Sequence, residues 1–305
     1  MTDERFTFVE IDKSASEHLT SPRYSYWKSV FKKFFSNKAA MVFLVVTVAV
    51  ILMSLIYPMF SSYSTEIHPY INDFGRRFIS PSGKFWFGTD NIGDPLFDQI
   101  WLGTRNSLTI AIIATTITTV LGVIVGAFWG YSKKMDVVMI EIYNVVANVP
   151  FTLVVIILMY VLGQGYWQLI FALSVTSWLG TAYFIRIQVM MIRDREYNLA
   201  SRCLGTPMKR IITHNIMPFL VSVIVTSISR DVPNFISYEV FLSYLGIGLT
   251  ETDCSLGRLI TKFAPYMKST PYLFWIPVAM SAVISVSLYI VGQTLADASD
   301  PKTHM

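Results

Sequence analysis

The feature that most restricts the fold of this chain is a series of long apolar runs, the first of which, 39–57, contains no charged residue. A run of roughly 20 apolar residues matches the bilayer core, and inside lipid a helix satisfies its own backbone hydrogen bonds. Only 14% of the residues are charged, whereas soluble domains carry about 25%. Further runs follow at 107–130, 137–162, 167–190, 219–241 and 272–295. The sequence therefore predicts an all-α polytopic membrane protein with six transmembrane helices.

An amphipathic segment precedes the first run. Its apolar residues recur on one helical side and its lysines lie near the other: Trp27, Val30, Phe31, Phe34 and Phe35 against Lys28, Lys32 and Lys33. This pattern is typical of a helix in a membrane interface, and a plain soluble helix is the alternative. The run 39–57 is too long for the apolar region of a signal peptide, and no small-residue cleavage pattern follows it. We therefore expect an interfacial helix followed by a first membrane span.

Three glycines at four-residue spacing mark the run 107–130. Gly122, Gly126 and Gly130 form a smooth stripe on one helical face. Because a stripe of small residues lets another backbone approach closely, we expect a neighbouring helix to pack against this face.

Polar residues inside the run 137–162 are candidates for a transport path. Asn144 and Asn148 share a helical face with Glu141, and Pro150 then interrupts the run. One interpretation is a wet or partner-facing surface beside a path. The other is an interfacial half-helix that shows its polar side to water.

Charged residues also lie deep in the run 219–241. Arg230 and Asp231 stand near its middle, and Glu239 stands toward its end. Charges at that depth need protein partners or water, and adjacent helical residues do not face each other, so a simple internal pair is not expected. We predict that Arg230, Asp231 and Glu239 lie on the translocation path together with Asn144 and Asn148. Arg186, near the end of its run, is expected to snorkel toward the interface.

A polar segment between the fourth and fifth runs is predicted to form an elbow. A short helix begins at Glu196, and Gly205 stands where a C′ glycine would end it. Thr206 and Pro207 then restart a helix, because proline is tolerated at a first helical position. Nothing interrupts that second helix before Pro218. The local structure is therefore a helix-turn-helix elbow.

This elbow resembles the EAA loop of the permease subunits of bacterial ABC importers, in which Glu-Ala-Ala precedes a glycine and, thirteen residues after it, a proline. The pattern falls on Leu199, Ala200, Ser201, Gly205 and Pro218, with Leu199 where the family has Glu. In that family the loop is a coupling helix that docks on a cytosolic ATPase. The resemblance thus implies coupling roles for Glu196, Tyr197, Leu199, Ala200, Ser201, Arg202, Gly205, Thr206, Pro207 and Pro218.

Further stretches are similar to the C-type subunits of oligopeptide and dipeptide permeases, and the sequence most resembles those of Gram-positive bacteria. They are FGTDNIG at 87–93, GTRNSL at 103–108, EVFLSYLGIG at 239–248 with SLG at 255–257, and DASDPK at 297–302. Asp94 and Pro95 stand where the family has Arg-Asp. From its own residue type, Asp90 is predicted to be a turn or helix-capping residue. In the resembled fold, 239–257 includes a partly re-entrant loop on the external side.

The basic residues orient the chain. Most of the 24 lysines and arginines fall in the N-terminal segment, the loop at 133–136, the elbow and the tail, so the positive-inside rule places these in the cytosol. The predicted organisation is a cytosolic segment 1–38 with the interfacial helix, a first span 39–57, an extracellular loop 58–106, a core of five helices at 107–295 that includes the coupling loop 193–218, and a cytosolic tail 296–305.

Signatures of catalysis are missing from the sequence. It contains no Walker A motif and no serine-hydrolase or metalloprotease motif. Cys203 and Cys254 fall in opposite predicted compartments, and the four histidines are scattered, at His18, His68, His214 and His304. We therefore expect no metal site, no nucleic-acid binding and no enzyme activity. A membrane-embedded enzyme would need ionisable groups clustered at one depth, and only Arg230, Asp231 and Glu239 come near that.

The resemblance implies the permease subunit of an ATP-driven importer of oligopeptides or dipeptides in the cell membrane. The partners it implies are a second permease subunit, two cytosolic ABC ATPase subunits, an extracellular peptide-binding lipoprotein, a peptide substrate and the lipid bilayer. ATP and Mg would be bound by the ATPase subunits, and no cofactor by this chain. The alternative is a self-sufficient secondary transporter or channel for small solutes, which would show an inverted repeat with broken helices in matching places.

Overall fold

The computed structural model describes residues 26–299, with the side chains of Tyr26 and Trp27 left out. The polar segment 1–22 and several residues singled out in the sequence lie outside this part, namely His18, Asp300, Pro301, Lys302 and His304. The long helices are α3 (Lys38–Phe60), α4 (Leu96–Tyr131), α7 (Tyr166–Arg193), α10 (Met217–Tyr244) and α12 (Pro271–Ser299). The shorter elements are α2 (Tyr26–Ser36), η1 (Phe74–Arg76), α5 (Lys133–Ala147), α6 (Phe151–Leu162), α8 (Glu196–Cys203), α9 (Met208–Arg210), η2 (Ile211–Ile216), α11 (Leu256–Phe263) and η3 (Ala264–Tyr266).

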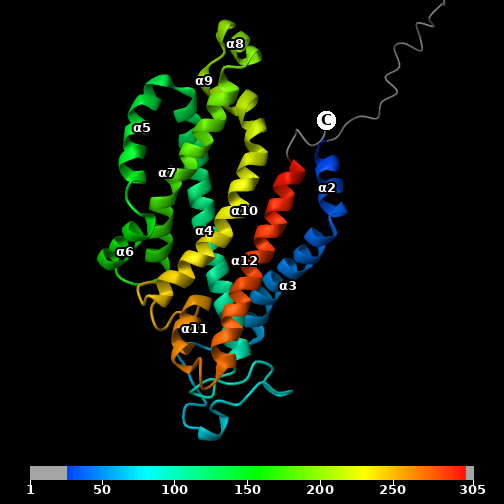
Figure 1. Cartoon of the computed structure of the whole chain (residues 1–305), viewed down its shortest axis with the longest axis vertical. Helices are drawn as coiled ribbons and strands as arrows, with labels where there is room; N and C mark the ends of the chain where they lie inside the picture. The colour runs from blue at the N-terminus through cyan, green and yellow to red at the C-terminus, as the bar shows by residue number, and fades with distance from the viewer. Residues whose placement is uncertain (1–25, 300–305) are drawn as a thin grey trace, which may run out of the picture.

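The long helices run along the long axis of the molecule (Figure 1). Helix α8 stands at one end of this bundle, and α11 lies at the other end beside the loop that joins α3 to α4. Helix α2 and the last turns of α12 lie toward the α8 end. We refer to these as the α8 end and the α11 end.

Five helices of the described part are long and apolar enough to cross a membrane, and the bent pair α5–α6 makes a sixth crossing if it is counted as one span. Helix α3, which contains the predicted first span, buries few of its residues within the chain and leaves most of its apolar side chains exposed. Such an all-round apolar helix at the periphery is typical of a segment in contact with lipid. The predicted all-α membrane fold is confirmed.

The glycine stripe of α4 packs against α7. A Cβ placed on Gly122 would lie 2.6 Å from Cγ2 of Thr181, and one on Gly130 would lie 2.6 Å from the carbonyl oxygen of Arg186. Neither spacing is tolerated between real atoms, so only glycine allows the two backbones this close. The predicted close approach of a helix to this stripe is confirmed, and α7 is that helix.

The run 137–162 is divided into two helices that meet at an angle of 80°. Pro150 stands between α5 and α6, where proline has no backbone N–H to donate and disfavours helical geometry in the residue before it. Helix α5 contains no residue that is buried within the chain. This crossing is therefore a broken one, and its first half is attached only loosely to the bundle.

Helix α4 is longer than the predicted second span of 107–130, because it begins at Leu96. Its added first turns are held by contacts that hydropathy does not reveal. Leu96 and Ile100 are fully buried in a cluster with Leu259 and Phe263 of α11. The α11 end therefore extends the helix by packing.

Pro218 does not end the second helix of the elbow, contrary to the sequence-based expectation. Residues 208–244 form one continuous helical stretch of 37 residues, and the π-helix η2 lies just before the proline. Proline removes a backbone donor, and a π turn widens the helix locally, so the two irregularities occur together without a break. The membrane-crossing helix is thereby joined directly to the elbow.

Candidate functional site

The elbow is closed by a glycine turn. Gly205 has a φ of +78°, which glycine adopts without strain, and it follows Leu204, the C-cap residue of α8. Its N–H donates to the carbonyl of Arg202 at 2.9 Å, and the N–H of Thr206 donates to that of Ser201 at 3.0 Å. These two bonds form a Schellman motif. Pro207 then precedes α9. The structure therefore has the predicted helix, glycine break and helix restart.

Two asparagines hold the elbow onto the bundle. Asn198 is fully buried and donates to the carbonyl of Ile192 at 2.9 Å. Asn215, on η2, donates to the Asn198 side-chain oxygen at 3.1 Å and to Oγ of Ser201 at 3.2 Å. Neither asparagine was predicted from the sequence. The signal for Asn198 was a polar residue on the inner side of an otherwise exposed helix.

A pair of arginines anchors the other side of the elbow. Arg193 is 8% exposed and donates to the carbonyl of Gly130, at the end of α4, at 2.8 Å. Its Nε also contacts Asp194 at 3.0 Å, and this hydrogen bond holds the pKa of the Asp194 carboxyl below its usual range. Arg202 donates to the carbonyl of Arg193 at 2.8 Å. Movement of the elbow would therefore be transmitted to α4 as well as to α10.

The outward side of α8 is apolar. Tyr197 is 40% exposed, Leu199 is 44% exposed and Leu204 is 86% exposed. The ten predicted coupling residues divide between two surfaces. Ser201 and Arg202 are inward anchors, as described above, and the others lie on the exposed or half-exposed side: Glu196, Tyr197, Leu199, Ala200, Gly205, Thr206, Pro207 and Pro218. Leu199, which replaces the family's Glu, adds to the apolar face.

A cavity of about 490 Å³, which we call the central cavity, lies among α4, α5, α6, α7 and α10. Arg230, Asp231 and Asn234 of α10 line it together with Tyr143 of α5. Nε of Arg230 lies 3.4 Å from Oδ1 of Asp231. The two neighbours do interact, contrary to expectation, because the long guanidinium side chain bends back to the carboxylate. The Arg230 side chain remains 56% exposed, and a group in the cavity can reach it.

The other predicted path residues do not reach this cavity. Asn144 and Asn148 are exposed on α5 and are not among the residues that line it. Glu239 is fully buried and also lies apart from it. Helical spacing placed the two asparagines on one face but could not tell which way that face points. In this conformation only Arg230 and Asp231 of the five predicted residues meet in the cavity.

Arg186 does not snorkel as predicted. Its guanidinium pairs with the Asp136 carboxylate of α5, and Trp129 donates to Oδ1 of the same carboxylate at 2.8 Å. The Arg186 side chain is only 12% exposed. Because Asp136 lies fifty residues away in the chain, the partner was not visible in the sequence. The pair ties the loosely held α5 to α4 and α7.

At the α11 end, three of the family-like stretches meet at one carboxylate. Oε1 of Glu239 accepts hydrogen bonds from Ser243 at 3.0 Å and from Ser255 at 2.6 Å, and Oε2 accepts one from Ser107 at 2.8 Å. A Cβ on Gly257 would lie 2.8 Å from Oε1, so the glycine makes room for the carboxylate. We call these four polar residues the serine clamp. It holds α4, α10 and the start of α11 together.

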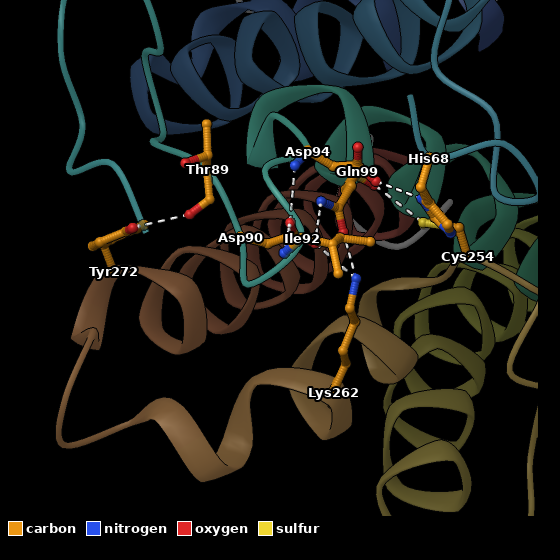
Figure 2. Close-up of polar contacts among 9 residues, drawn as sticks. All are labelled: His68, Thr89, Asp90, Ile92, Asp94, Gln99, Cys254, Lys262 and Tyr272. Atoms are coloured by element: carbon orange, nitrogen blue, oxygen red, sulfur yellow. Dashed lines mark hydrogen bonds and ion pairs between the residues drawn. The ribbon is translucent and has the colours of Figure 1, made fainter. Parts of the chain in front are cut away.

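Asp90 is the centre of a second polar network, drawn in Figure 2. It is fully buried, and its Oδ1 accepts from the backbone N–H groups of Ile92 and Asp94 at 3.0 Å and 2.9 Å. Its Oδ2 accepts from Gln99 at 3.0 Å and from Lys262 of α11 at 2.8 Å. The predicted turn role of Asp90 is confirmed. The cation across the chain is an addition that only the fold reveals.

The adjacent Asp94 has a different partner. Its Oδ2 lies 2.6 Å from Nδ1 of His68, and the Asp94 side chain is 1% exposed (Figure 2). Burial raises the pKa of the Asp94 carboxyl, and the hydrogen bond from His68 offsets part of that effect. Asp94, which together with Pro95 stands where the family has Arg-Asp, therefore pairs with a histidine 26 positions away in the chain.

A bundle of membrane-crossing helices around a cavity that contains a charged pair, with a capped elbow at one end, is typical of a membrane transport subunit. Comparison with known proteins specifies the class. The family described as the binding-protein-dependent transport system inner membrane component matches residues 119–305, and the N-terminal TM domain of oligopeptide transport permease C matches residues 25–81. The chain belongs to the binding-protein-dependent transport system inner membrane component family and has the type I importer permease fold.

Three relatives of the chain match it over nearly their whole length. The chain is 54% identical to the oligopeptide transport system permease protein AmiD of Streptococcus pneumoniae, a match that covers 99% of this chain and 98% of that protein. It is 34% identical to OppC of Bacillus subtilis, with 94% and 93% covered, and 31% identical to OppC of Escherichia coli, with 94% and 95% covered. These two relatives are also oligopeptide transport system permease proteins.

Proposed function

We propose that this chain is the transmembrane permease subunit of an ATP-driven importer of oligopeptides or dipeptides in the cell membrane. The observation that carries the proposal is the 54% identity, over almost the whole of both chains, to an oligopeptide permease of a Gram-positive bacterium. Relatives named for dipeptide transport support the wider substrate class. A second permease subunit, two cytosolic ATPase subunits and an extracellular peptide-binding lipoprotein complete the transporter. ATP and Mg are bound by the ATPase subunits.

In this proposal the α8 end and both chain termini lie in the cytosol. The basic residues of the elbow support that orientation, since positively charged loops are retained inside. The apolar outward side of α8, with Leu199 and Leu204, docks on an ATPase subunit. Closure of the ATPase pair then displaces the elbow, and the hydrogen bonds of Asn198 and Arg193 pass the motion to the bundle. The membrane helices alternate between inward and outward openings as a result.

The central cavity forms this subunit's half of the translocation path. Arg230 is accessible there, and a charge at that depth is stable only against protein, water or a charged ligand, since burying it in hydrocarbon costs on the order of 2.5 to 3.5 kcal/mol. Its guanidinium is suited to a peptide carboxylate, and Asp231 to a peptide amine. Hydrogen bonds to the peptide backbone are available from Asn234 and from the hydroxyl groups of α7.

The test is peptide uptake by proteoliposomes that contain the assembled transporter. We expect uptake of a labelled peptide to require ATP and the binding protein, and Arg230→Leu to abolish it at equal protein level. Arg230→Lys, which keeps the charge, should retain part of the activity. Parental uptake by Arg230→Leu would remove this residue from the path. Uptake by the chain alone, driven by a proton or sodium gradient, would replace the proposal with the secondary-transporter alternative.

A further inference from the structure

A second cavity, of about 450 Å³, opens at the α11 end, which the proposed topology places outside the cell. Its walls come from three separate parts of the chain: the loop that follows α3, the start of α4, and α11 with the loop before it. Gln99 and Cys254 are buried and belong to its lining, and Figure 2 shows them together with His68 and Lys262. Its volume falls in the range of small-molecule sites, about 300 to 1,000 Å³. We call it the outer cavity.

Most of the positive charge around the outer cavity is already neutralised. Lys262 is bound to Asp90, and His68 is bound to Asp94. Arg258 is different. Within residues 26–299 its guanidinium has neither a carboxylate partner nor a hydrogen-bond acceptor, although its backbone N–H is bonded to Ser255. A half-buried guanidinium in a pocket, with its donors free, is the protein group best suited to bind a carboxylate.

Negative charge lines the same cavity. Glu251 is exposed, and no cation of the described part pairs with it. Asp253 uses Oδ2 to accept from the backbone N–H and the hydroxyl of Thr250, at 3.2 Å and 2.6 Å, which turns it into a fixed acceptor. Within the described residues neither carboxylate forms an ion pair with Arg258, so both charges of the cavity remain available to a ligand.

Tyr63 adds a neutral donor to the wall of the outer cavity. Burial raises the pKa of its phenol, so the hydroxyl keeps its proton at physiological pH. An unpaired cation, two carboxylates and an uncharged hydroxyl thus line one cavity. A simple anion would be repelled by the carboxylates, and a simple cation by Arg258. A ligand with both charges satisfies both sides.

We propose that the outer cavity binds a small zwitterion, a dipeptide or a free amino acid, with its carboxylate at Arg258 and its ammonium group at Asp253 and Glu251. The choice of a dipeptide as a ligand rests on the proposed function, because peptides are the proposed cargo. The site is separate from the central cavity, and α11 connects it to the serine clamp through Ser255.

The experiment is equilibrium dialysis of the full-length, detergent-solubilised chain against radiolabelled L-alanyl-L-alanine. The dipeptide is compared with its N-acetyl derivative and its C-terminal amide. On the parent chain we expect both modified forms to bind at least about tenfold more weakly than the dipeptide, because each loses a charge-assisted contact. Equal binding of all three forms would overturn the proposal, and so would the absence of measurable binding.

Variants of the charged side chains test which of them binds the carboxylate of the dipeptide and which binds its amine. Arg258→Gln should weaken dipeptide binding about tenfold and remove the preference for a free carboxylate over the amide. Arg258→Lys should restore part of both effects, which a mere folding defect would not do. The double variant Glu251→Gln with Asp253→Asn should instead remove the preference for a free amine over the acetylated form. If either variant keeps the preference assigned to its charge, the assignment is wrong.

A final control separates this cavity from the central one. Arg230→Leu is expected to block uptake in the assembled transporter. In dialysis it should remove at most the binding that belongs to the central cavity, so the dipeptide that still binds should keep its preference for a free carboxylate and a free amine. If Arg230→Leu abolishes binding while Arg258→Gln does not, the bound dipeptide occupies the central cavity and the outer site is rejected. A different result would support the outer site and contradict the proposed path. In that case Arg258→Gln loses binding, and Arg230→Leu keeps normal ATP-driven uptake.

Discussion

The two ends of the bundle are held in opposite ways. At the α11 end, Glu239 and Asp90 are fully buried carboxylates, and side-chain donors from distant parts of the chain converge on each. At the α8 end, two asparagines and two arginines anchor a helix whose outward side exposes Leu199 and Leu204. A buried polar network specifies one arrangement and is costly to distort. The α11 end is therefore fixed from within the chain, whereas the α8 end leaves an exposed apolar surface that, in the proposed function, contacts an ATPase subunit.

The largest effect is expected from removing the centre of the serine clamp. Glu239→Ala leaves three buried hydroxyl groups without their acceptor, and buried groups left unpaired cost about 1 to 3 kcal/mol each. We expect a loss of folded protein, or a melting temperature well below that of the parent in detergent. Glu251→Gln, at an exposed carboxylate of the same end, is the control and should melt like the parent. Equal melting of Glu239→Ala and the parent would show that the clamp does not fix this end.

The next effect concerns Gly88, whose φ is +80°. A Cβ there would lie 2.5 Å from the carbonyl oxygen of Ile79 and 2.7 Å from the Tyr272 ring, so Gly88→Ala combines backbone strain with a clash. Strain of this kind costs about 1 to 3 kcal/mol. Thermal unfolding should show a lower melting temperature for Gly88→Ala than for the parent. Gly83→Ala changes a glycine of the same loop with open space around it and should melt like the parent. Similar losses of stability in the two variants would refute the local explanation.

Gly205→Val tests the other end. Its φ of +78° matches that of Gly88, but a Cβ there would meet no atom within 4 Å, so only the backbone strain of about 1 to 2 kcal/mol remains. We expect normal membrane insertion and a smaller loss of thermal stability than for Gly88→Ala. Uptake in the assembled transporter should nevertheless fall far more than ATP hydrolysis does. If peptide-stimulated hydrolysis and uptake both equal the parent values, the elbow does not dock on the ATPase.

The smallest effects should have opposite pH dependence at the two ends. Arg193 lowers the pKa of Asp194. Above the ordinary carboxyl pKa, the contact between Asp194 and Arg193 therefore stabilises the parent relative to Asp194→Asn. This difference in stability is lost as pH falls through the lowered pKa. Burial raises the pKa of Asp94. The parent should therefore lose stability relative to Asp94→Asn as pH rises through that raised value.

Melting temperatures of the two variants and the parent, measured from strongly acidic to neutral pH, check these signs. The Asp194 difference should be small at every pH, because the carboxylate is 54% exposed and water screens it. The same slope for both variants would contradict the distinction between a buried and an exposed end.

Local chemistry made much of this protein predictable. The apolar runs indicated the membrane helices, because the length of such a run and its lack of charge are set by the bilayer alone. The C′ glycine at Gly205 and the turn role of Asp90 followed from backbone and side-chain chemistry within a few residues. The glycine stripe of α4 could likewise be read from its spacing, although the sequence did not say that α7 covers it.

The tertiary structure decided which distant residues meet. Glu239 and Ser107 are 132 positions apart, and Lys262 and Asp90 are 172 apart, so their contacts depend on how α4, α10 and α11 pack. The same holds for Arg186, which pairs with Asp136 instead of reaching the interface, and for Asn144 and Asn148, which are not among the residues that line the central cavity. Hydropathy and turn propensity are properties of short segments. The rotation of each helix about its axis is set by its neighbours, and that rotation determined which polar side chains became clamps, anchors or cavity walls.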